Sequence, residues 1–321
     1  MNTPPLLDLR VRALRWEAED VLSLELDAPD GAALPPFEAG AHIDLHLPDG
    51  GPVRSYSLLN DPAERHRYVV AVHRHPASRG GSRWLHERLR CGQRLAVGTP
   101  RNNFPLDESA ALSVLFAGGI GITPLLGMAR RLGTIGRPWR LHYASRSRAH
   151  AAFLPELQAL ARSTGGELDL HFDDERGRLL DLPGLVSALP PTAHAYCCGP
   201  LPMLEAFEQA TAGWAPERVH REYFAARESA ATDGGFTVEA ARSGQRVRVQ
   251  PGQTILDALI GVGIEPMYSC REGVCGTCEV GVIAGQPDHR DLVLTEAERA
   301  AGRRILVCCS GSKSDTLVLD L

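Results

Sequence analysis

The sequence predicts a multidomain protein of mixed α/β and α+β class, built from an antiparallel β-barrel, a parallel α/β domain and a cysteine-rich α+β module. Three observations predict this. Short β-like runs separated by turns fill the first third of the chain, strand-like and helix-like runs alternate in the middle, and five of the eight cysteines lie after residue 269. The 321 residues, 44% of them hydrophobic, suffice for two or three domains with separate cores.

Residues 1–105 are expected to form the barrel. Turn signals such as Pro29-Asp30-Gly31 and Pro48-Asp49-Gly50-Gly51 separate the β-like runs. Many short strands at this spacing are typical of a small antiparallel barrel. The expected strands are Leu9–Trp16, Val21–Leu26, His42–Leu47, Arg54–Leu58, Tyr68–His73 and Arg94–Gly98.

Residues 106–225 are expected to form a parallel sheet with helices between its strands. The alternating order predicts nucleotide binding at the carboxyl ends of the strands. The expected strands are Leu112–Ala117, Arg140–Ala144, Leu168–Phe172 and Ala193–Cys197, and the expected helices are Pro124–Leu132, Ala152–Ala161, Leu182–Ala188 and Leu201–Ala212.

A polar linker is expected at residues 226–234, followed by an α+β module at residues 235–321. The module begins with a hairpin, Phe236–Ala241 and Arg246–Gln250, and a helix at Thr254–Val262.

Composition excludes some classes of function. The net charge is −5 and no basic block occurs, which argues against nucleic acid binding. The uncharged segment Ala110–Ala129 contains four glycines and a proline, which indicate a strand, a turn and a helix start instead of a membrane span. No secretory signal is visible in Met1–Arg10, so we expect a cytoplasmic monomer without membrane association.

The strongest local signal is the cysteine loop. Cys270, Cys275 and Cys278 have the spacing Cys-x4-Cys-x2-Cys, the ligand pattern of plant-type [2Fe–2S] clusters. Gly273 and Gly276 allow the backbone to wrap closely and turn N–H groups toward the sulfides. A zinc site is the alternative, but no second pair of cysteines matches its usual spacing. Cys308 is the expected fourth ligand, with Cys309 as the competing candidate.

Four motifs carry a resemblance to the phthalate dioxygenase reductase family, which includes vanillate O-demethylase reductases. They are Arg54-Ser55-Tyr56-Ser57, Gly118-Gly119-Ile120-Gly121-Ile122-Thr123-Pro124, Cys198-Gly199-Pro200 and the cysteine loop. The resemblance covers nearly the full length. It implies an FMN-binding barrel at 1–105, an NAD-binding domain at 106–225 and a β-grasp ferredoxin domain at 235–321, with FMN, NADH and a [2Fe–2S] cluster as cofactors.

The same resemblance assigns the flavin contacts. Arg54 reaches the flavin phosphate, Tyr56 packs on the ring, and Ser57 hydrogen-bonds near the flavin N5, with Ser55 between them. Backbone groups of Ala71, Val72 and His73 line the ring edge, and Arg79, Gly81 and Ser82 contact the phosphate. The choice of FMN over FAD rests on the resemblance alone.

The nicotinamide contacts follow in the same way. Gly118, Gly119 and Gly121 let the pyrophosphate approach a helix start, and Thr123 also approaches the flavin. Cys198 borders the nicotinamide beside Gly199 and Pro200, and Phe224 covers the flavin ring. Ser57, Cys198 and Phe224 act in catalysis by positioning the reactants, because hydride transfer needs no acid or base.

The adenosine end of the site leaves the choice of coenzyme open on the residues alone. Ser145 and Arg146 follow the second strand of the parallel sheet, where an arginine can hold a 2′-phosphate. The alternative is a solvated basic turn, and Asp173, after the third strand, would disfavour extra phosphate charge. The resemblance favours NADH.

Electron counting then predicts the activity. NADH gives two electrons as a hydride, a [2Fe–2S] cluster accepts one, and a flavin converts between them. We expect the reductase component of a Rieske-type oxygenase, with that oxygenase as the protein partner. A reductase serving a cytochrome P450 and a redox sensor with low turnover are the alternatives, although a sensor has no need of a nicotinamide site.

Overall fold

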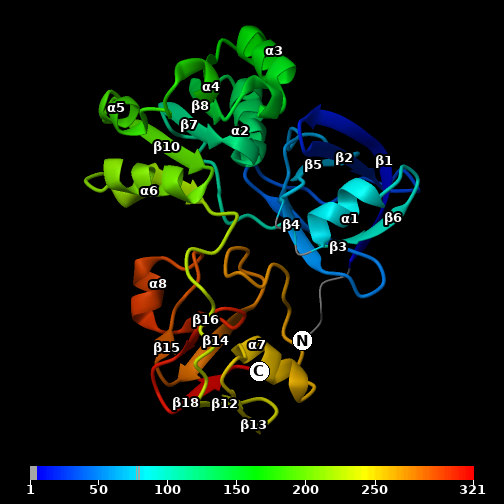
Figure 1. Cartoon of the computed structure of the whole chain (residues 1–321), viewed down its shortest axis with the longest axis vertical. Coiled ribbons are helices and arrows are strands. Elements are labelled where there is room, and N and C mark those ends of the chain that lie inside the picture. The colour runs from blue at the N-terminus through cyan, green and yellow to red at the C-terminus, as the bar shows by residue number, and fades with distance from the viewer. Residues whose placement is uncertain (1–5, 77, 79) are drawn as a thin grey trace. The chain divides into compact units, whose positions relative to one another are not determined.

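The computed structural model describes residues 6–76, 78 and 80–321. The chain divides into two compact units, one ending at Phe224 and the other spanning Ala225–Leu321. Both the antiparallel and the parallel sheet lie in the first unit, and the cysteine-rich module forms the second (Figure 1).

A six-stranded antiparallel sheet forms the barrel. Its strands are β1 (Leu7–Ala18), β2 (Val21–Asp27), β3 (His42–His46), β4 (Val53–Ser57), β5 (Tyr68–His73) and β6 (Arg94–Val97), in the order β4-β3-β6-β1-β2-β5. The outer strands β4 and β5 contact each other, so the sheet curls onto itself. Leu24, Ile43, Leu45, Val70 and Val97 alternate along the strands and fill a core that is almost fully buried.

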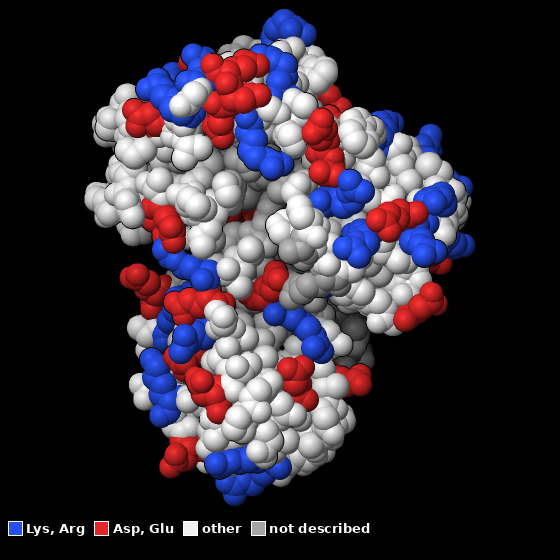
Figure 2. Space-filling model, viewed as in Figure 1, with Lys and Arg blue, Asp and Glu red and all other residues white. Residues whose placement is uncertain are grey.

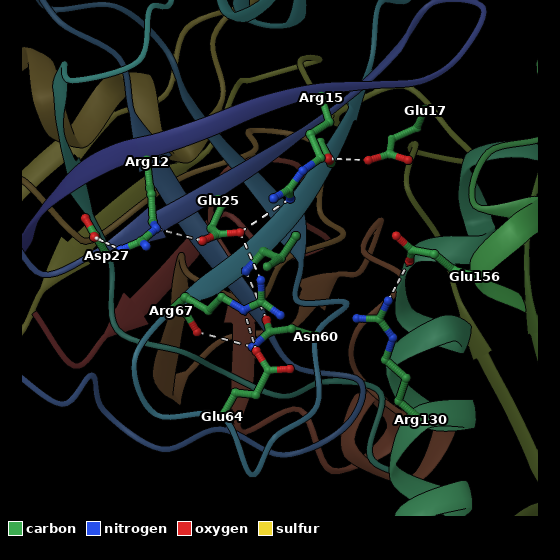
Figure 3. A network of polar contacts seen from close by, with 12 residues as sticks. Arg12, Arg15, Glu17, Glu25, Asp27, Asn60, Glu64, Arg67, Arg130 and Glu156 are labelled. Atoms are coloured by element: carbon green, nitrogen blue, oxygen red, sulfur yellow. Dashed lines mark hydrogen bonds and ion pairs between the residues drawn. The ribbon is translucent and has the colours of Figure 1, made fainter. Parts of the chain in front are cut away.

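Three arginines converge on one carboxylate on the barrel, as Figure 3 shows. Glu25 of β2 lies 2.9 Å from Arg67, 3.3 Å from Arg12 and 3.4 Å from Arg15, and only 7% of its side chain is exposed. Arg12 and Arg15 lie on β1 and Arg67 directly precedes β5. Because β1 and β5 are the two neighbours of β2, these pairs join side chains across both ladders and stabilise the strand register.

The parallel sheet has the order β11-β10-β7-β8-β9, and every neighbouring pair is parallel. Its strands are β7 (Leu112–Gly118), β8 (Trp139–Ser145), β9 (Glu167–Phe172), β10 (Ala193–Cys198) and β11 (Val219–Glu222). All five carboxyl ends therefore lie at one edge, where this class of sheet binds its ligands.

Helices cover this sheet. They are α2 (Ile122–Thr134), α3 (Leu154–Thr164), α4 (Asp173–Arg176), α5 (Leu182–Ser187) and α6 (Leu201–Ala210), with short 3-10 turns η1 (Gly119–Gly121), η2 (Arg148–His150) and η3 (Pro216–Arg218). Leu115 of β7 packs in one cluster with α2 and α3. The next residue, Phe116, points to the opposite face and contacts Phe207 of α6, with ring centroids 5.9 Å apart.

The second unit is a β-grasp module. Its mixed sheet has the order β13-β12-β18-β14-β16, with a parallel central pair β12–β18. The strands are β12 (Thr237–Ala240), β13 (Gln245–Arg248), β14 (Glu279–Ala284), β16 (Arg304–Leu306) and β18 (Thr316–Leu319), and β15 (Pro287–Asp288) pairs with β17 (Gly311–Ser312). Helix α7 (Ile255–Gly261) begins at a Thr254–Asp257 capping box and buries Ile255 and Leu259 under the sheet. Helix α8 (Glu296–Ala301) begins at a similar box at Thr295.

Residues 226–234, expected as a linker, pack against the module that follows. The Ala231 N–H donates to the Cys309 carbonyl at 2.7 Å, and the Thr232 carbonyl accepts from the Gly252 N–H at 2.8 Å. Glu228 forms an ion pair with Arg290 at 3.0 Å. This segment is therefore part of the second unit and is held to the rest of it by hydrogen bonds and an ion pair.

The uncharged segment Ala110–Ala129 forms β7, η1 and the start of α2, as its glycines indicated. Within the described part of the chain, no helix has both the length and the apolar character that crossing a bilayer requires. Acidic and basic side chains are interspersed over the face shown in Figure 2.

Candidate functional site

The expected flavin motif lies on β4, in the barrel. Ser55 donates to Asp44 on the neighbouring strand β3 at 2.7 Å, and Arg101 donates to the other oxygen of Asp44 at 2.7 Å. Ser57 is buried, and burial raises the pKa of Tyr56. On β5, the Val72 carbonyl is hydrogen-bonded to His86 at 2.9 Å. The motif is thus anchored through Ser55, while Arg54 and Tyr56 lie on the other face of the strand.

The expected phosphate site joins Arg54 to the start of helix α1 (Gly81–Glu87). A Cβ on Gly81 would lie 2.9 Å from Cγ and 3.0 Å from Nε of Arg54. The arginine stem therefore packs directly on the glycine backbone, beside the first N–H groups of the helix, which have no partner within it. Ser82 donates to Ser78 at 2.9 Å. Arg79 lies outside the described residues. A cationic side chain beside exposed N–H groups fits a phosphate.

The two glycine motifs of the parallel sheet meet backbone to backbone. A Cβ on Gly121 would lie 2.2 Å from the Cys198 carbonyl oxygen, and one on Gly118 would lie 2.6 Å from Pro200. A Cβ on Gly199 would lie 3.1 Å from the Gly118 Cα, and Gly119 has φ +53°. Only glycine permits this approach, so the turn after β7 and the turn after β10 form one surface at the ligand-binding edge.

A buried carboxyl, to which the sequence analysis gave no role, lies at this edge. Glu222 ends β11 and pairs in register with Cys198, which ends β10. Burial raises the pKa of Glu222 to about 8, and its Oε2 has no hydrogen-bond partner among the described residues. Burial, together with Glu222, raises the pKa of the Cys198 thiol well above its ordinary value. An orphaned buried oxygen fits a ligand that brings an N–H donor, such as a carboxamide. The sequence carried no clear signal for this carboxyl, because β11 is an edge strand whose residues are half-buried or exposed and no strand was expected there.

The remaining residues expected at the nicotinamide site lie at the same edge or near it. Thr123 is buried and donates to the Ile120 carbonyl at 3.0 Å. Ser145 is buried at the end of β8, and Arg146 is exposed directly after it. Asp173 begins α4 after β9 and lies 3.5 Å from His171. Phe224 is 38% exposed and ends the first unit, so its ring is available for stacking.

A second arginine in the turn after β8 already has a carboxylate partner. Arg148 makes two hydrogen bonds to the Glu175 carboxylate, at 3.1 and 3.2 Å. Its guanidinium also lies 4.4 Å from the Phe172 ring centroid. Since both contacts hold Arg148 against α4, a charged carboxylate already neutralises the cation that a 2′-phosphate would need.

In the second unit, the cysteine thiols gather in pairs. A hydrogen bond with Cys270 and burial raise the pKa of Cys275, and a hydrogen bond with Cys308 and burial raise that of Cys278. Cys270 also contacts Cys308. No three His, Cys, Asp or Glu side chains within the described ranges are arranged to hold a single metal ion. Four buried thiols in two neighbouring pairs are the donor set that fits a two-iron cluster.

The loop backbone explains how three of these thiols come together. Arg271, Gly273 and Gly276 have φ of +57°, +72° and +74°, so the chain reverses between the cysteines. The Glu272 N–H donates to the Cys270 sulfur at 3.3 Å, as sulfur ligands in such loops require.

Cys308 and Cys309, the two candidates for the fourth ligand, lie in a turn directly after β16. Their thiols nevertheless point to different partners. Cys308 contacts Cys270 and Cys278, whereas the Cys309 thiol lies 3.7 Å from the Leu306 carbonyl.

Comparison with known proteins extends this picture. Residues 238–312 match the model of a 2Fe-2S iron-sulfur cluster binding domain. The chain is 56% identical to phenoxybenzoate dioxygenase subunit beta of Ectopseudomonas oleovorans, over 98% of this chain and 97% of that protein. It is 39% identical to phthalate dioxygenase reductase of Burkholderia cepacia, over 100% of both chains.

Two solved structures are similar over 98% of this chain. A phthalate dioxygenase reductase, described as modular for electron transfer from pyridine nucleotides to [2Fe–2S], is 40% identical with a TM-score of 0.74, and 98% of it is covered. An intact type IV self-sufficient cytochrome P450 monooxygenase is 42% identical with a TM-score of 0.87, and 41% of it is covered.

A barrel with the flavin motif, a parallel sheet with paired glycine turns and a [2Fe–2S] module together define an iron–sulfur flavin oxidoreductase. The resemblance seen in the motifs is thereby confirmed, and so is the fold class. The chain belongs to the phthalate dioxygenase reductase family. Family membership and the matched cluster domain give FMN, NADH and a [2Fe–2S] cluster as its cofactors.

Proposed function

We propose that this protein is the NADH-dependent reductase component of a Rieske-type oxygenase. The observation that carries the proposal is the grouping of the Cys270, Cys275, Cys278 and Cys308 thiols in the second unit. FMN, when bound, converts the hydride of NADH into the single electrons that a [2Fe–2S] cluster accepts. The relatives named as dioxygenase components support an oxygenase as the final acceptor.

In this proposal the barrel binds and orients the flavin. Arg54, packed on Gly81, holds the phosphate together with Ser82 and Arg79, and Tyr56 lies along the ring. Ser57 provides the hydroxyl near the reacting edge. Hydrogen bonds from Ser55 and Arg101 to Asp44 fix β4, which keeps these groups in place without direct contact to the reactants.

The parallel sheet binds NADH at its carboxyl edge. Gly118, Gly119 and Gly121 let the pyrophosphate approach, and Cys198 lies where the nicotinamide would stack. The pKa of about 8 keeps Glu222 mostly protonated at neutral pH, so it places no negative charge against the reacting ring. Its orphaned Oε2 can accept a hydrogen bond from the carboxamide of NADH.

A cytochrome P450 is a second candidate acceptor. The observation that favours it is the 42% identity to the corresponding part of a self-sufficient P450, which covers 98% of this chain. In that protein a P450 is part of the same chain, whereas the phthalate dioxygenase reductase structure is matched along 98% of its length.

Electron delivery to two acceptors tests the proposal. The holoprotein, reduced by NADH without oxygen, is mixed with a Rieske oxygenase component or with a P450, and acceptor reduction is followed by stopped flow. We expect faster transfer to the Rieske centre. A protein that NADH reduces only over minutes, or that reduces neither acceptor, would overturn the proposal. Faster transfer to P450 haem would favour the second candidate. Cys91→Ser, which alters an exposed cysteine, serves as the control.

A further inference from the structure

A short strap ties together the two chain segments that carry the cysteines. The Leu292 N–H donates to the Gly273 carbonyl at 2.9 Å, within the first cysteine loop. Two residues earlier, the Arg290 N–H donates to Ser310 Oγ at 3.2 Å, directly after the second cysteine segment. Residues 289–292, named the strap here, therefore bridge both segments. A change in the strap would move the thiols relative to one another.

The strap is in backbone contact with the first loop. Gly273 has φ +72°, and a Cβ there would lie 3.1 Å from the Asp291 Cα and 2.5 Å from the Cys309 sulfur. No side chain separates the two segments at this point. Because the packing is this close, the position of Asp291 is transmitted directly to the loop.

The side chain of Asp291 fixes the turn of the strap. It is fully buried, and Oδ1 accepts from the N–H groups of Val293 at 3.0 Å and Leu294 at 2.8 Å. Arg299 of α8 donates to the Asp291 carbonyl, and its guanidinium lies 3.8 Å from Oδ1. Two acceptor bonds at one oxygen form an Asx turn, which asparagine makes equally well.

The second carboxylate oxygen of Asp291, Oδ2, takes no part in the turn. Oδ2 of Asp291 has no hydrogen-bond partner among the described residues, and the nearest titratable group is His289, whose Nδ1 lies 3.7 Å away. Burying a carboxylate with one unpaired oxygen is costly. Asparagine would stabilise the turn as well, so the turn alone does not account for the charge, which faces Arg299 at 3.8 Å and belongs to a residue whose Cα packs against the cysteine loop. The cysteine loop is in direct contact.

We propose that Asp291 is a positioning residue for the iron–sulfur cluster. It holds the strap across the two cysteine segments, and its negative charge lowers the reduction potential of the cluster. The inference rests on the ligand set proposed above. A buried negative charge favours the oxidised cluster, because reduction adds a further negative charge in a medium of low dielectric.

Two substitutions in the full-length holoprotein separate the two effects. Asp291→Asn keeps the acceptor oxygen and removes the charge, so we expect a retained cluster with a more positive midpoint potential and a changed EPR spectrum. Asp291→Ala removes both, and we expect the cluster to be lost to a chelator about tenfold faster. Asp320→Asn removes an exposed carboxylate of the same unit, paired with Arg242 at 2.7 Å, and should change neither quantity.

An Asp291→Asn protein with the wild-type potential and spectrum would overturn the electrostatic role. An Asp291→Asn protein that assembles no cluster would also contradict the proposal, because asparagine preserves the turn of the strap. If Asp291→Ala does not fold, the Asp291→Asn potential decides. Iron content of the wild type is measured separately: wild-type protein without two irons would refute the proposed cluster, whereas unshifted variants with two irons refute only the role of Asp291.

Discussion

The buried carboxyl of Glu222 lies beside the Cys198 thiol, at the carboxyl ends of the paired strands β11 and β10. Neither group ionises easily, since burial raises the pKa of both, and the neighbouring Glu222 raises that of Cys198 further. The proposed nicotinamide site is therefore close to uncharged at neutral pH, although two of its groups are titratable.

Glu222 should make stability depend on pH. The folded-state pKa, about 8, is above the ordinary value of 4.5, so the folded protein binds this proton more tightly than the unfolded chain. Its contribution is complete below about pH 4.5 and is lost as pH rises toward 8. Relative to Glu222→Gln, the wild type should lose stability over this window, as measured by urea titration at several pH values. A constant difference between the two proteins would contradict the pKa. The exposed Glu167→Gln is the control.

Gly121→Ala should damage the NADH site. Its Cβ would lie 2.2 Å from a backbone oxygen of Cys198, which cannot rotate away. We expect at least a tenfold lower kcat/KM for NADH and about 1–3 kcal/mol lower stability. Gly213→Ala is the matched control, because nothing lies within 4 Å of that position. Equal activity in the two variants would show that the glycine turns do not form the site.

Glu25→Ala should destabilise the barrel. The substitution leaves Arg12, Arg15 and Arg67 facing one another without their shared carboxylate. Because the arginines can partly rehydrate, we expect a loss of about 2 kcal/mol, measured by the urea transition that releases flavin. Glu167→Ala breaks a pair with Arg140 that is far more exposed, and should cost about 0.5 kcal/mol or less. Similar losses in both variants would argue against the network.

Glu175→Gln should relax the preference for NADH. The substitution releases Arg148 from its two bonds to the carboxylate and removes a negative charge beside the proposed adenosine ribose. An exposed pair is worth up to about 1 kcal/mol, so kcat/KM for NADPH should rise by about fivefold. The NADH value should change little. An unaltered NADPH value would place coenzyme selection elsewhere. Glu167→Gln, at the opposite end of β9, is the control.

The features that could be predicted from the sequence are those whose signal is local. The cysteine spacing, the glycine turn after β7 and the alternation of strands and helices each lie within one short stretch, so they predicted the module types and the family. Helix α1 was not among the expected helices, and it begins at Gly81, directly after the Gly80 turn.

What the sequence could not show depends on distant residues meeting. Glu222 acquires its pKa from burial beside Cys198, and no pattern around residue 222 encodes that neighbour. Asp291 is at least thirteen residues from every cysteine in the sequence, yet its backbone packs against Gly273 in the fold. The pairing of Arg148 with Glu175 and Phe172 likewise joins segments that no local pattern connects.

The most direct test follows electrons into the cluster. The wild type, Cys308→Ser and Cys309→Ser are mixed anaerobically with NADH, frozen at intervals and examined by EPR. We expect the wild type and Cys309→Ser to contain two irons and to develop a reduced [2Fe–2S] signal after the flavin is reduced. Cys308→Ser should not show the normal signal. Flavin reduction with no iron–sulfur signal in the wild type, or a normal signal in Cys308→Ser alone, would contradict it.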